Sequence, residues 1–154
     1  MLKPLFCLLF AAAATISPTQ AQTPIQVEQA WARATPGKST IAAAYLTIES
    51  QTDDRLIAIA SPVAEQVRLH EETTENGIAR MRQFDSLAIH AGQKLVLKPN
   101  GTHLMLIGLK QPLLAGQSIP LTLSFAGAGT IETQISVRKL GSPDDGDAMP
   151  GMHM

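Results

Sequence analysis

Short apolar runs separated by turn-forming residues constrain the fold of this chain more than any other feature. The runs are rich in leucine and β-branched residues, and they recur every eight to twelve residues between Gly, Pro, Asn and Asp. This rhythm is typical of β-strands, and the proline breaks exclude long helices. It predicts an all-β Greek-key sandwich or barrel of about seven to nine strands. The expected strands are 25–35, 41–49, 55–60, 65–70, 78–84, 94–97, 103–109, 119–125 and 131–139.

The N-terminus has the parts of a secretory signal peptide. Lys3 is basic, an apolar run extends from Leu5 to Ala14, and small residues lead to Ala21. The run is too short to span a membrane. We therefore expect export to the periplasm, cleavage after Ala21 and no membrane insertion. The predicted domains are a signal peptide (1–21), one folded domain (22–140) and a flexible C-terminal tail (141–154) rich in Gly, Pro and Asp.

Cysteine usage and charge exclude several classes of protein. Cys7, the only cysteine, lies inside the expected signal peptide. A lipoprotein lipidated there would have almost no signal sequence before it. Cleavage after Ala21 leaves no thiolate, so disulfides and a blue-copper centre are excluded. Removing Lys3 from the 12 basic residues leaves 11 against 13 acidic ones, which does not favour nucleic acid as a partner.

Two histidines and two methionines at fixed intervals suggest a metal site. His70 and Met81 are separated by ten residues, Met81 and His103 by twenty-one, and His103 and Met105 by one. Taken singly, each would be an ordinary surface histidine or core methionine. Imidazole and thioether together suit Cu(I), whereas thioether sulfur is a poor ligand for zinc, calcium or magnesium. The group therefore predicts a copper site.

Local patterns predict how these donors meet. Asn76-Gly77 favours a two-residue type I′ hairpin turn, in which paired residue numbers sum to 153. His70 would then share a face with Met81, one diagonal step away. His103 and Met105 lie two apart in one strand and so share a face, with Leu104 and Leu106 on the core side. The meeting of the two pairs depends on the fold. His90 is expected to be an ordinary loop residue, whereas Trp31, Tyr45 and Phe125 are expected to pack in the core between two sheets.

The C-terminal tail offers a candidate second site. Its aspartates and His153 suit Cu(II), and its methionines suit Cu(I). The alternative is a solvated tail that binds nothing. The candidate tail ligands are Met149, Met152, His153 and Met154.

The His-x10-Met-x21-His-x-Met pattern resembles the signature of the PCuAC family of periplasmic copper chaperones. The resemblance covers Ile25 to Lys139. It implies a cupredoxin-like β-sandwich that binds Cu(I) through the four residues. It also implies delivery of copper to the CuA site of cytochrome c oxidase subunit II, alongside a Sco-type thioredoxin-like protein. The supporting segments are 30–34, 44–46, 69–71, 101–106 and 121–125.

Other functions remain as alternatives. An enzyme is not expected, because no serine lies in an elbow motif and no nucleophile has a convincing histidine and carboxylate setting. A metal-free secreted sandwich that serves as an interaction module and a copper storage or tolerance protein are the remaining alternatives. We expect the protein to be a monomer.

Overall fold

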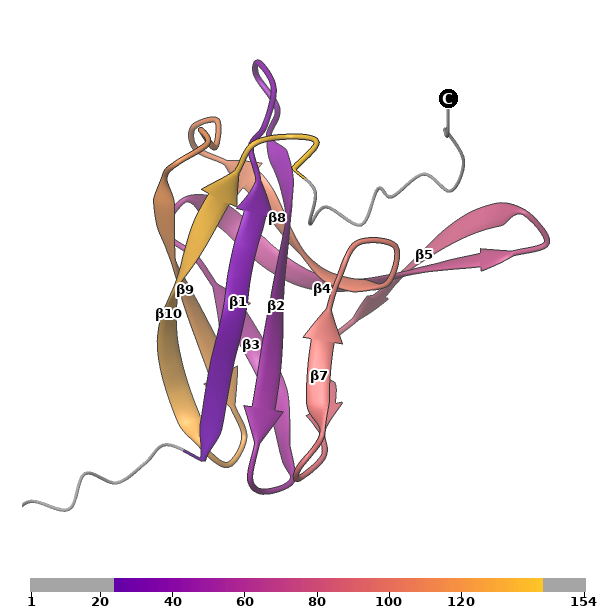
Figure 1. The fold of residues 1–154 in the computed structure, drawn as a ribbon, viewed down its shortest axis with the longest axis vertical. Helices are drawn as coiled ribbons and strands as arrows, with labels where there is room; N and C mark the ends of the chain where they lie inside the picture. The colour runs from indigo at the N-terminus through magenta and orange to yellow at the C-terminus, as the bar shows by residue number, and fades with distance from the viewer. Residues whose placement is uncertain (1–23, 143–154) are drawn as a thin grey trace, which may run out of the picture.

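The computed structural model describes residues 24–142, which form a sandwich built only of strands (Figure 1). The predicted signal peptide and the four candidate tail ligands lie outside the described residues. None of the described residues belongs to a helix that could cross a membrane. The strands are β1 (Ile25–Arg33), β2 (Ile41–Ser50), β3 (Asp54–Ala60), β4 (Ala64–Glu75), β5 (Ile78–Phe84), β6 (Leu87–Ile89), β7 (Lys94–Leu97), β8 (Thr102–Leu109), β9 (Ser118–Phe125) and β10 (Gly129–Arg138).

All nine strands expected from the sequence are present, and the all-β cupredoxin-like class is confirmed. The additional strand, β6, is only three residues long, too short for an alternating pattern to reveal it. A second difference is the length of β4, which extends past His70 to Glu75. The extra residues 71–75 pair with β5 across the Asn76-Gly77 turn.

Pairing links the strands in the order β5-β4-β8-β2-β1-β10-β9-β3-β6, and β7 pairs with the second half of β2. The first and last strands, β1 and β10, are parallel neighbours, while the other pairs are antiparallel. Alternate residues of the strands point inward and form one core cluster. Its fully buried members include Leu46, Leu56, Leu104, Leu121 and Ile135.

The β4–β5 hairpin projects from the body of the sandwich (Figure 1). β4 pairs with β8 only as far as Glu71, opposite Thr102, and beyond that point it pairs with β5 alone. Six of the seven residues of β5 are exposed. The candidate metal ligands therefore lie where the hairpin leaves the body, across β5, β4 and β8.

Candidate metal site

The β4–β5 hairpin brings His70 and Met81 into contact. Asn76 and Gly77 both have positive φ, 52° and 76°, as a type I′ turn requires. The register is the predicted one: His70 lies opposite Gln83, and Met81 lies opposite Glu72. The His70 Nδ1 atom is 3.2 Å from the Met81 Sδ atom. Two donors bound tetrahedrally to one ion, at the bond lengths of zinc to nitrogen and sulfur, would be roughly 3.5 Å apart. The pair already has nearly that separation.

β8 supplies the other two candidate ligands. His103 lies directly opposite His70 in the β4–β8 register, and the ring centroids are 6.0 Å apart. Met105 lies opposite Arg68, one diagonal step from His70 on the same face. Leu104, which lies between His103 and Met105 in β8, points into the core and is fully buried. Three adjacent strands thus place all four predicted residues on one face, and the β4–β5 hairpin alone would supply only two of them.

Exposure is graded across the four side chains. His103 is only 5% exposed, His70 and Met105 are intermediate, and Met81 is 54% exposed. β8 lies between β2 and β4, whereas β5 is an edge strand. The β8 half of the site is therefore held inside the sheet, and the Met81 end opens to solvent.

A backbone carbonyl orients His103. Its Nδ1–H donates a 2.8 Å hydrogen bond to the Gly101 carbonyl oxygen, which leaves the lone pair on Nε2. Metal-binding histidines are commonly fixed in this way by a carbonyl on the second nitrogen. Gly101 ends the Pro99-Asn100-Gly101 turn, where Asn100 has a φ of 58°. The turn thus prepares His103 to use Nε2 as a ligand.

His70 lacks such support. Its Nε2 atom is buried and makes no hydrogen bond. Desolvation by burial lowers the pKa of His70 below its ordinary value of 6.5, the nearby His103 lowers it further, and the Gln83 side chain opposes both. The imidazole is therefore neutral at pH 7, the form that binds metals. With Nδ1 beside the Met81 sulfur as the metal-facing nitrogen, Nε2 carries the proton of the neutral ring.

These features fit Cu(I) among the common biological metals. The donors are two neutral imidazoles and two thioethers, a set that suits a soft monovalent ion. Among residues 24–142, no group of three or more His, Cys, Asp or Glu side chains could hold a metal. The His/Met group differs because half of its donors are thioethers.

Tyr45 and Trp31 lie on the same sheet face as the four candidate ligands, on the neighbouring strands β2 and β1. Both are buried as expected, but their location differs from the expected position between the sheets. Ala32, Ala44 and Leu46 belong to the core cluster, so Trp31 and Tyr45 point to the opposite face. The Trp31 and Tyr45 ring centroids are 4.4 Å apart, and the Tyr45 and His103 centroids are 6.3 Å apart. Phe125 does lie in the core cluster, and His90 is an exposed residue outside the strands, as expected.

Trp31, Tyr45, His103 and His70 thus form a row of neighbouring rings. This row was not predicted, because Ala42-Ala43-Ala44 gives β2 small apolar residues on both faces. The sequence signal that could have revealed it is in β1 and β2: Ala32 and Ala44 occupy the core side beside Trp31 and Tyr45. Successive side chains of a strand point to opposite faces of the sheet, so alanines on the core face place the neighbouring large rings on the other face.

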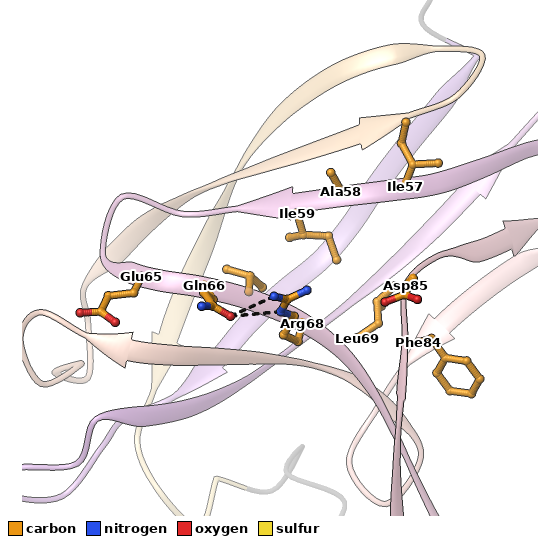
Figure 2. Close-up of a pocket in the computed structure, with 10 residues that line it drawn as sticks. Ile57, Ala58, Ile59, Glu65, Gln66, Arg68, Leu69, Phe84 and Asp85 are labelled. Atoms are coloured by element: carbon orange, nitrogen blue, oxygen red, sulfur yellow. Dashed lines mark hydrogen bonds between the residues drawn. The ribbon is translucent and has the colours of Figure 1, made fainter.

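A separate pocket lies between β3 and β4 (Figure 2). It has a volume of about 440 Å³ and contains none of the four candidate ligands. Arg68 lines it and donates to the Gln66 side-chain oxygen from Nε and from the terminal nitrogen, at 3.2 and 3.0 Å. Exposed Ile57 and half-buried Ile59 form part of its wall. The pocket is therefore distinct from the metal site.

Known proteins with solved structures share this fold. The solution structure of apo-DR1885 from Deinococcus radiodurans is 32% identical, with a TM-score of 0.60, and the match covers 90% of this chain and 94% of that one. A second solution structure is of CuI-DR1885, at 30% identity, 85% coverage of each chain and a TM-score of 0.58. The copper-bound PCuAC domain from PmoF2 is 23% identical, with a TM-score of 0.65, and covers 77% of this chain and 96% of that one.

Comparisons of sequence assign the family. A curated relative, "Putative lipoprotein Lxx21020" from Leifsonia xyli subsp. xyli, is 36% identical over 128 residues, which cover 79% of this chain and 77% of the relative. Residues 25–137 match the family described as "LpqE-like: Putative lipoprotein LpqE-like". That range contains every strand but the last residue of β10. The chain therefore belongs to the LpqE-like family, which is related to the PCuAC domains.

Proposed function

We propose that this protein is an exported copper metallochaperone that carries Cu(I) on His70, Met81, His103 and Met105. One observation carries the proposal: β5, β4 and β8 gather two facing imidazoles and two thioethers on a single face. The 3.2 Å contact between His70 Nδ1 and Met81 Sδ and the oriented ring of His103 support it. Solved relatives whose titles name bound copper or Cu(I) give further support.

The chemistry suits a carrier better than an enzyme. Four neutral ligands hold a monovalent ion without adding charge, so release does not require separating strongly bound opposite charges. A thioether has no acidic proton, and it remains available as a ligand in an acidic, oxidising compartment. Met81 is the most exposed of the four ligands. An incoming ligand can therefore reach the ion from that side before the inner ligands let go.

The destination follows from the family resemblance. We propose delivery to the CuA site of cytochrome c oxidase subunit II, with a Sco-type thioredoxin-like protein as a second partner. The name of the curated relative describes a lipoprotein, which supports export of this chain as well. Mass spectrometry of the mature protein tests the exported form. Cleavage after Ala21 gives an unmodified chain beginning at Gln22, whereas a lipidated Cys7 would contradict that cleavage.

Competition for Cu(I) against a chromophoric chelator tests the site. The double variant Met81→Ala/Met105→Ala is expected to bind Cu(I) at least about 100-fold more weakly, since each lost ligand removes a direct bond. Ile78→Ala is the matched control, because Ile78 is 60% exposed on the same strand and its side chain points to the other face. Equal affinity of the double variant and the wild type would overturn the assignment.

The C-terminal tail is proposed as a second site. Met149, Met152, His153 and Met154 provide sulfur for Cu(I) and nitrogen for Cu(II), and the neighbouring aspartates add oxygen ligands. Deleting residues 141–154 and titrating with each oxidation state tests this role. The full chain should bind more copper than the truncated one, and equal stoichiometry in both oxidation states would refute the tail site.

A further inference from the structure

His70 and His103 face each other across β4 and β8, but they turn different nitrogens toward the candidate copper site. On His103 the Gly101 carbonyl accepts the Nδ1–H, which leaves Nε2 available as a ligand. On His70 it is Nδ1 that lies 3.2 Å from the Met81 sulfur and so faces the site. A neutral imidazole carries one proton, and in His70 that proton belongs on Nε2. The two rings therefore need acceptors at opposite nitrogens.

The Nε2 atom of His70 is enclosed by the protein. It is buried, and no group among residues 24–142 makes a hydrogen bond of normal length and angle with it. Leaving a buried N–H unsatisfied is costly. It also leaves the tautomer unset, because nothing then favours the proton on Nε2 over Nδ1. A neighbouring acceptor that turns toward Nε2 would remove the cost and fix the tautomer.

Gln83 of β5 is placed to be that acceptor. It lies directly opposite His70 in the β4–β5 register, so the two side chains project from one face as close cross-strand neighbours. Burial lowers the pKa of His70 most and His103 lowers it further, whereas hydrogen bonding with the Gln83 side chain acts to raise it. An acceptor has this effect because it stabilises a ring N–H. The Gln83 amide has no other hydrogen-bond partner within residues 24–142.

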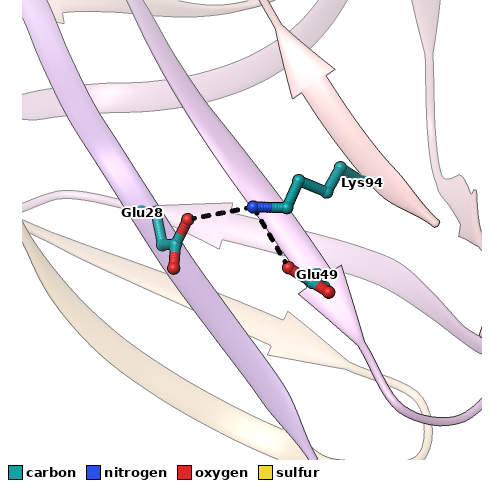
Figure 3. A network of polar contacts seen from close by, with 3 residues as sticks. All are labelled: Glu28, Glu49 and Lys94. Atoms are coloured by element: carbon teal, nitrogen blue, oxygen red, sulfur yellow. Dashed lines mark ion pairs between the residues drawn. The ribbon is translucent and has the colours of Figure 1, made fainter. Parts of the chain in front are cut away.

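The carboxylates of this sheet face do not act on the His70 ring. Within the described part of the chain, no carboxylate is among the groups that shift the pKa of His70, although Glu72 lies only two residues further along β4. Glu28 and Glu49, on β1 and β2, both pair with Lys94 of β7, at 3.5 and 3.3 Å (Figure 3). An uncharged acceptor also suits a site whose ligands are all neutral.

β5 thus presents one group to each nitrogen of the same ring. Met81 and Gln83 are two residues apart, so they project from the same face of the strand. Met81 contacts Nδ1 from the diagonal position, and Gln83 faces the ring from the directly opposite position. Thioether sulfur is a weak acceptor and does not draw the proton to Nδ1, whereas an amide oxygen is a strong one. The pair therefore favours the tautomer with the proton on Nε2.

We propose that Gln83 is a positioning residue of the copper site: its side-chain carbonyl accepts the Nε2–H of His70 and presents Nδ1 to the ion. His70 then binds through Nδ1 and His103 through Nε2, and each ring has a carbonyl acceptor on its other nitrogen. Removing an outer partner of this kind commonly weakens metal binding by about 10- to 100-fold. The role of Gln83 toward copper rests on the proposed function, whereas its hydrogen bond and the His70 tautomer do not.

Proton–nitrogen correlation spectra of the metal-free protein test the hydrogen bond. They are recorded at neutral pH, where His70 is uncharged because its pKa lies below 6.5. We expect the wild type to carry the His70 proton on Nε2. Gln83→Leu has no acceptor and should move part of the population to the Nδ1–H form, while Gln83→Glu keeps an acceptor and should retain Nε2–H. Gln51→Leu, the same change at an exposed residue between β2 and β3, should leave the tautomer unchanged.

Two results for His70 would overturn the hydrogen bond: a wild-type ring protonated on Nδ1, or the same tautomer ratio in Gln83→Leu and the wild type. His103 serves as an internal control, because the Gly101 carbonyl holds its Nδ1–H. Loss of that His103 tautomer in Gln83→Leu would also overturn the proposal, since it would show a general disturbance of the site.

Competition for Cu(I) against a chromophoric chelator tests the role toward copper. Gln83→Leu should bind Cu(I) about tenfold more weakly than the wild type, and Gln83→Glu and Gln51→Leu should bind nearly as tightly. Wild-type affinity in Gln83→Leu, or equal weakening in the leucine and glutamate variants, would overturn that role. Spectra of the Cu(I)-loaded wild type should show the remaining protons on Nε2 of His70 and Nδ1 of His103. A proton on Nδ1 of His70 would contradict the assignment.

The two kinds of measurement separate this inference from the proposed function. A wild-type protein that does not bind Cu(I) would refute the metallochaperone, and with it the role of Gln83 toward copper, even if the tautomer shifts as expected. Tight Cu(I) binding by the wild type with an unchanged His70 tautomer in Gln83→Leu would leave the metallochaperone standing and overturn the positioning role alone.

Discussion

His70 of β4 and His103 of β8 are direct cross-strand neighbours, with ring centroids 6.0 Å apart and an interplanar angle of 70°. Directly opposed residues of an antiparallel pair are the closest that two strands can offer. A metal–nitrogen bond of about 2 Å to each ring fits between them. The two histidines are therefore placed by backbone pairing, and the two methionines of the candidate site lie at positions diagonal to His70.

Acid should destabilise the metal-free protein through His70. Its folded pKa lies below 6.5, mainly because burial disfavours the charged ring. As the pH falls through 6.5, the unfolded chain takes up a proton that the folded chain resists, so the free energy of unfolding decreases. Urea unfolding between about pH 7 and pH 5 should show this loss in the wild type and a smaller one in His70→Gln. Matching pH profiles for the two proteins would contradict the prediction.

Inserting one alanine after Gly77 should remove Met81 from the site. The insertion shifts the β5 register by one residue, and a one-residue slip turns every side chain of a strand to the other face. Cu(I) affinity should then fall to that of Met81→Ala. Inserting two alanines should restore the face and recover much of the affinity. Chelator competition on all three variants measures the effect, and an unchanged affinity after the single insertion would show that Met81 is not a ligand.

Asn100 should control how well His103 is oriented. Asn tolerates the left-handed φ of 58°, whereas a β-branched residue is strained there by about 1–2 kcal/mol. Asn100→Val is expected to displace the Gly101 carbonyl and to weaken Cu(I) binding by about tenfold. Asn100→Gly should keep wild-type affinity. The nitrogen chemical shifts of His103 provide a second measurement, since loss of the Nδ1–H tautomer should appear only in the valine variant.

Asp54 should stabilise the side of the sandwich away from the metal. Its carboxylate accepts hydrogen bonds from the backbone N–H groups of Arg55, Gly127 and Ala128, at 2.7, 2.7 and 2.9 Å. Desolvation acts to raise the pKa of Asp54, but these bonds together lower it below 3.8. The stabilisation is present above pH 3.8 and lost as the pH falls through the lower, folded pKa.

Asp54→Ala should lower the free energy of unfolding by about 1–3 kcal/mol at neutral pH, because the donors at the β9–β10 turn lose their acceptor. Cu(I) affinity should stay unchanged, since β3 and that turn lie away from the ligands. Denaturant unfolding and chelator competition on the same variant test both statements. Asp53→Ala, which removes a single hydrogen bond from the Ala91 N–H, is the neighbouring control. An Asp54→Ala variant as stable as Asp53→Ala would count against the prediction.

Local patterns predicted the parts of the site that depend on neighbouring residues. The Asn76-Gly77 turn set the pairing of His70 and Met81, and strand alternation set the shared face of His103 and Met105. The sequence did not predict that β4 pairs with β8, because this pairing depends on contacts between residues far apart in the sequence. The direct opposition of His70 and His103 follows only from that pairing.

The missed features have physical causes. Ala42 to Ala44 give no clear inside and outside to β2, so only the weak signal of the alanines beside Trp31 and Tyr45 pointed to the outward position of these two rings. The β1–β2 register shifts between Glu28 and Trp31, where Gln29 has a positive φ. A glycine at that position would have indicated the bulge in the sequence, but the residue is glutamine. The His103 side chain donates to the Gly101 backbone carbonyl, and residue types do not specify which carbonyl a side chain meets.

The parallel pairing of β1 with β10 has a consequence for biogenesis. The first and last strands are neighbours, so the sandwich closes only after the whole chain is available. The strands that carry the four candidate ligands are contiguous in space and lie within residues 64–109. Short-range pairing is faster than closure between distant segments. On the proposed export route we therefore expect the ligand-bearing strands to assemble early, and closure of the sandwich through β1 and β10 to come last.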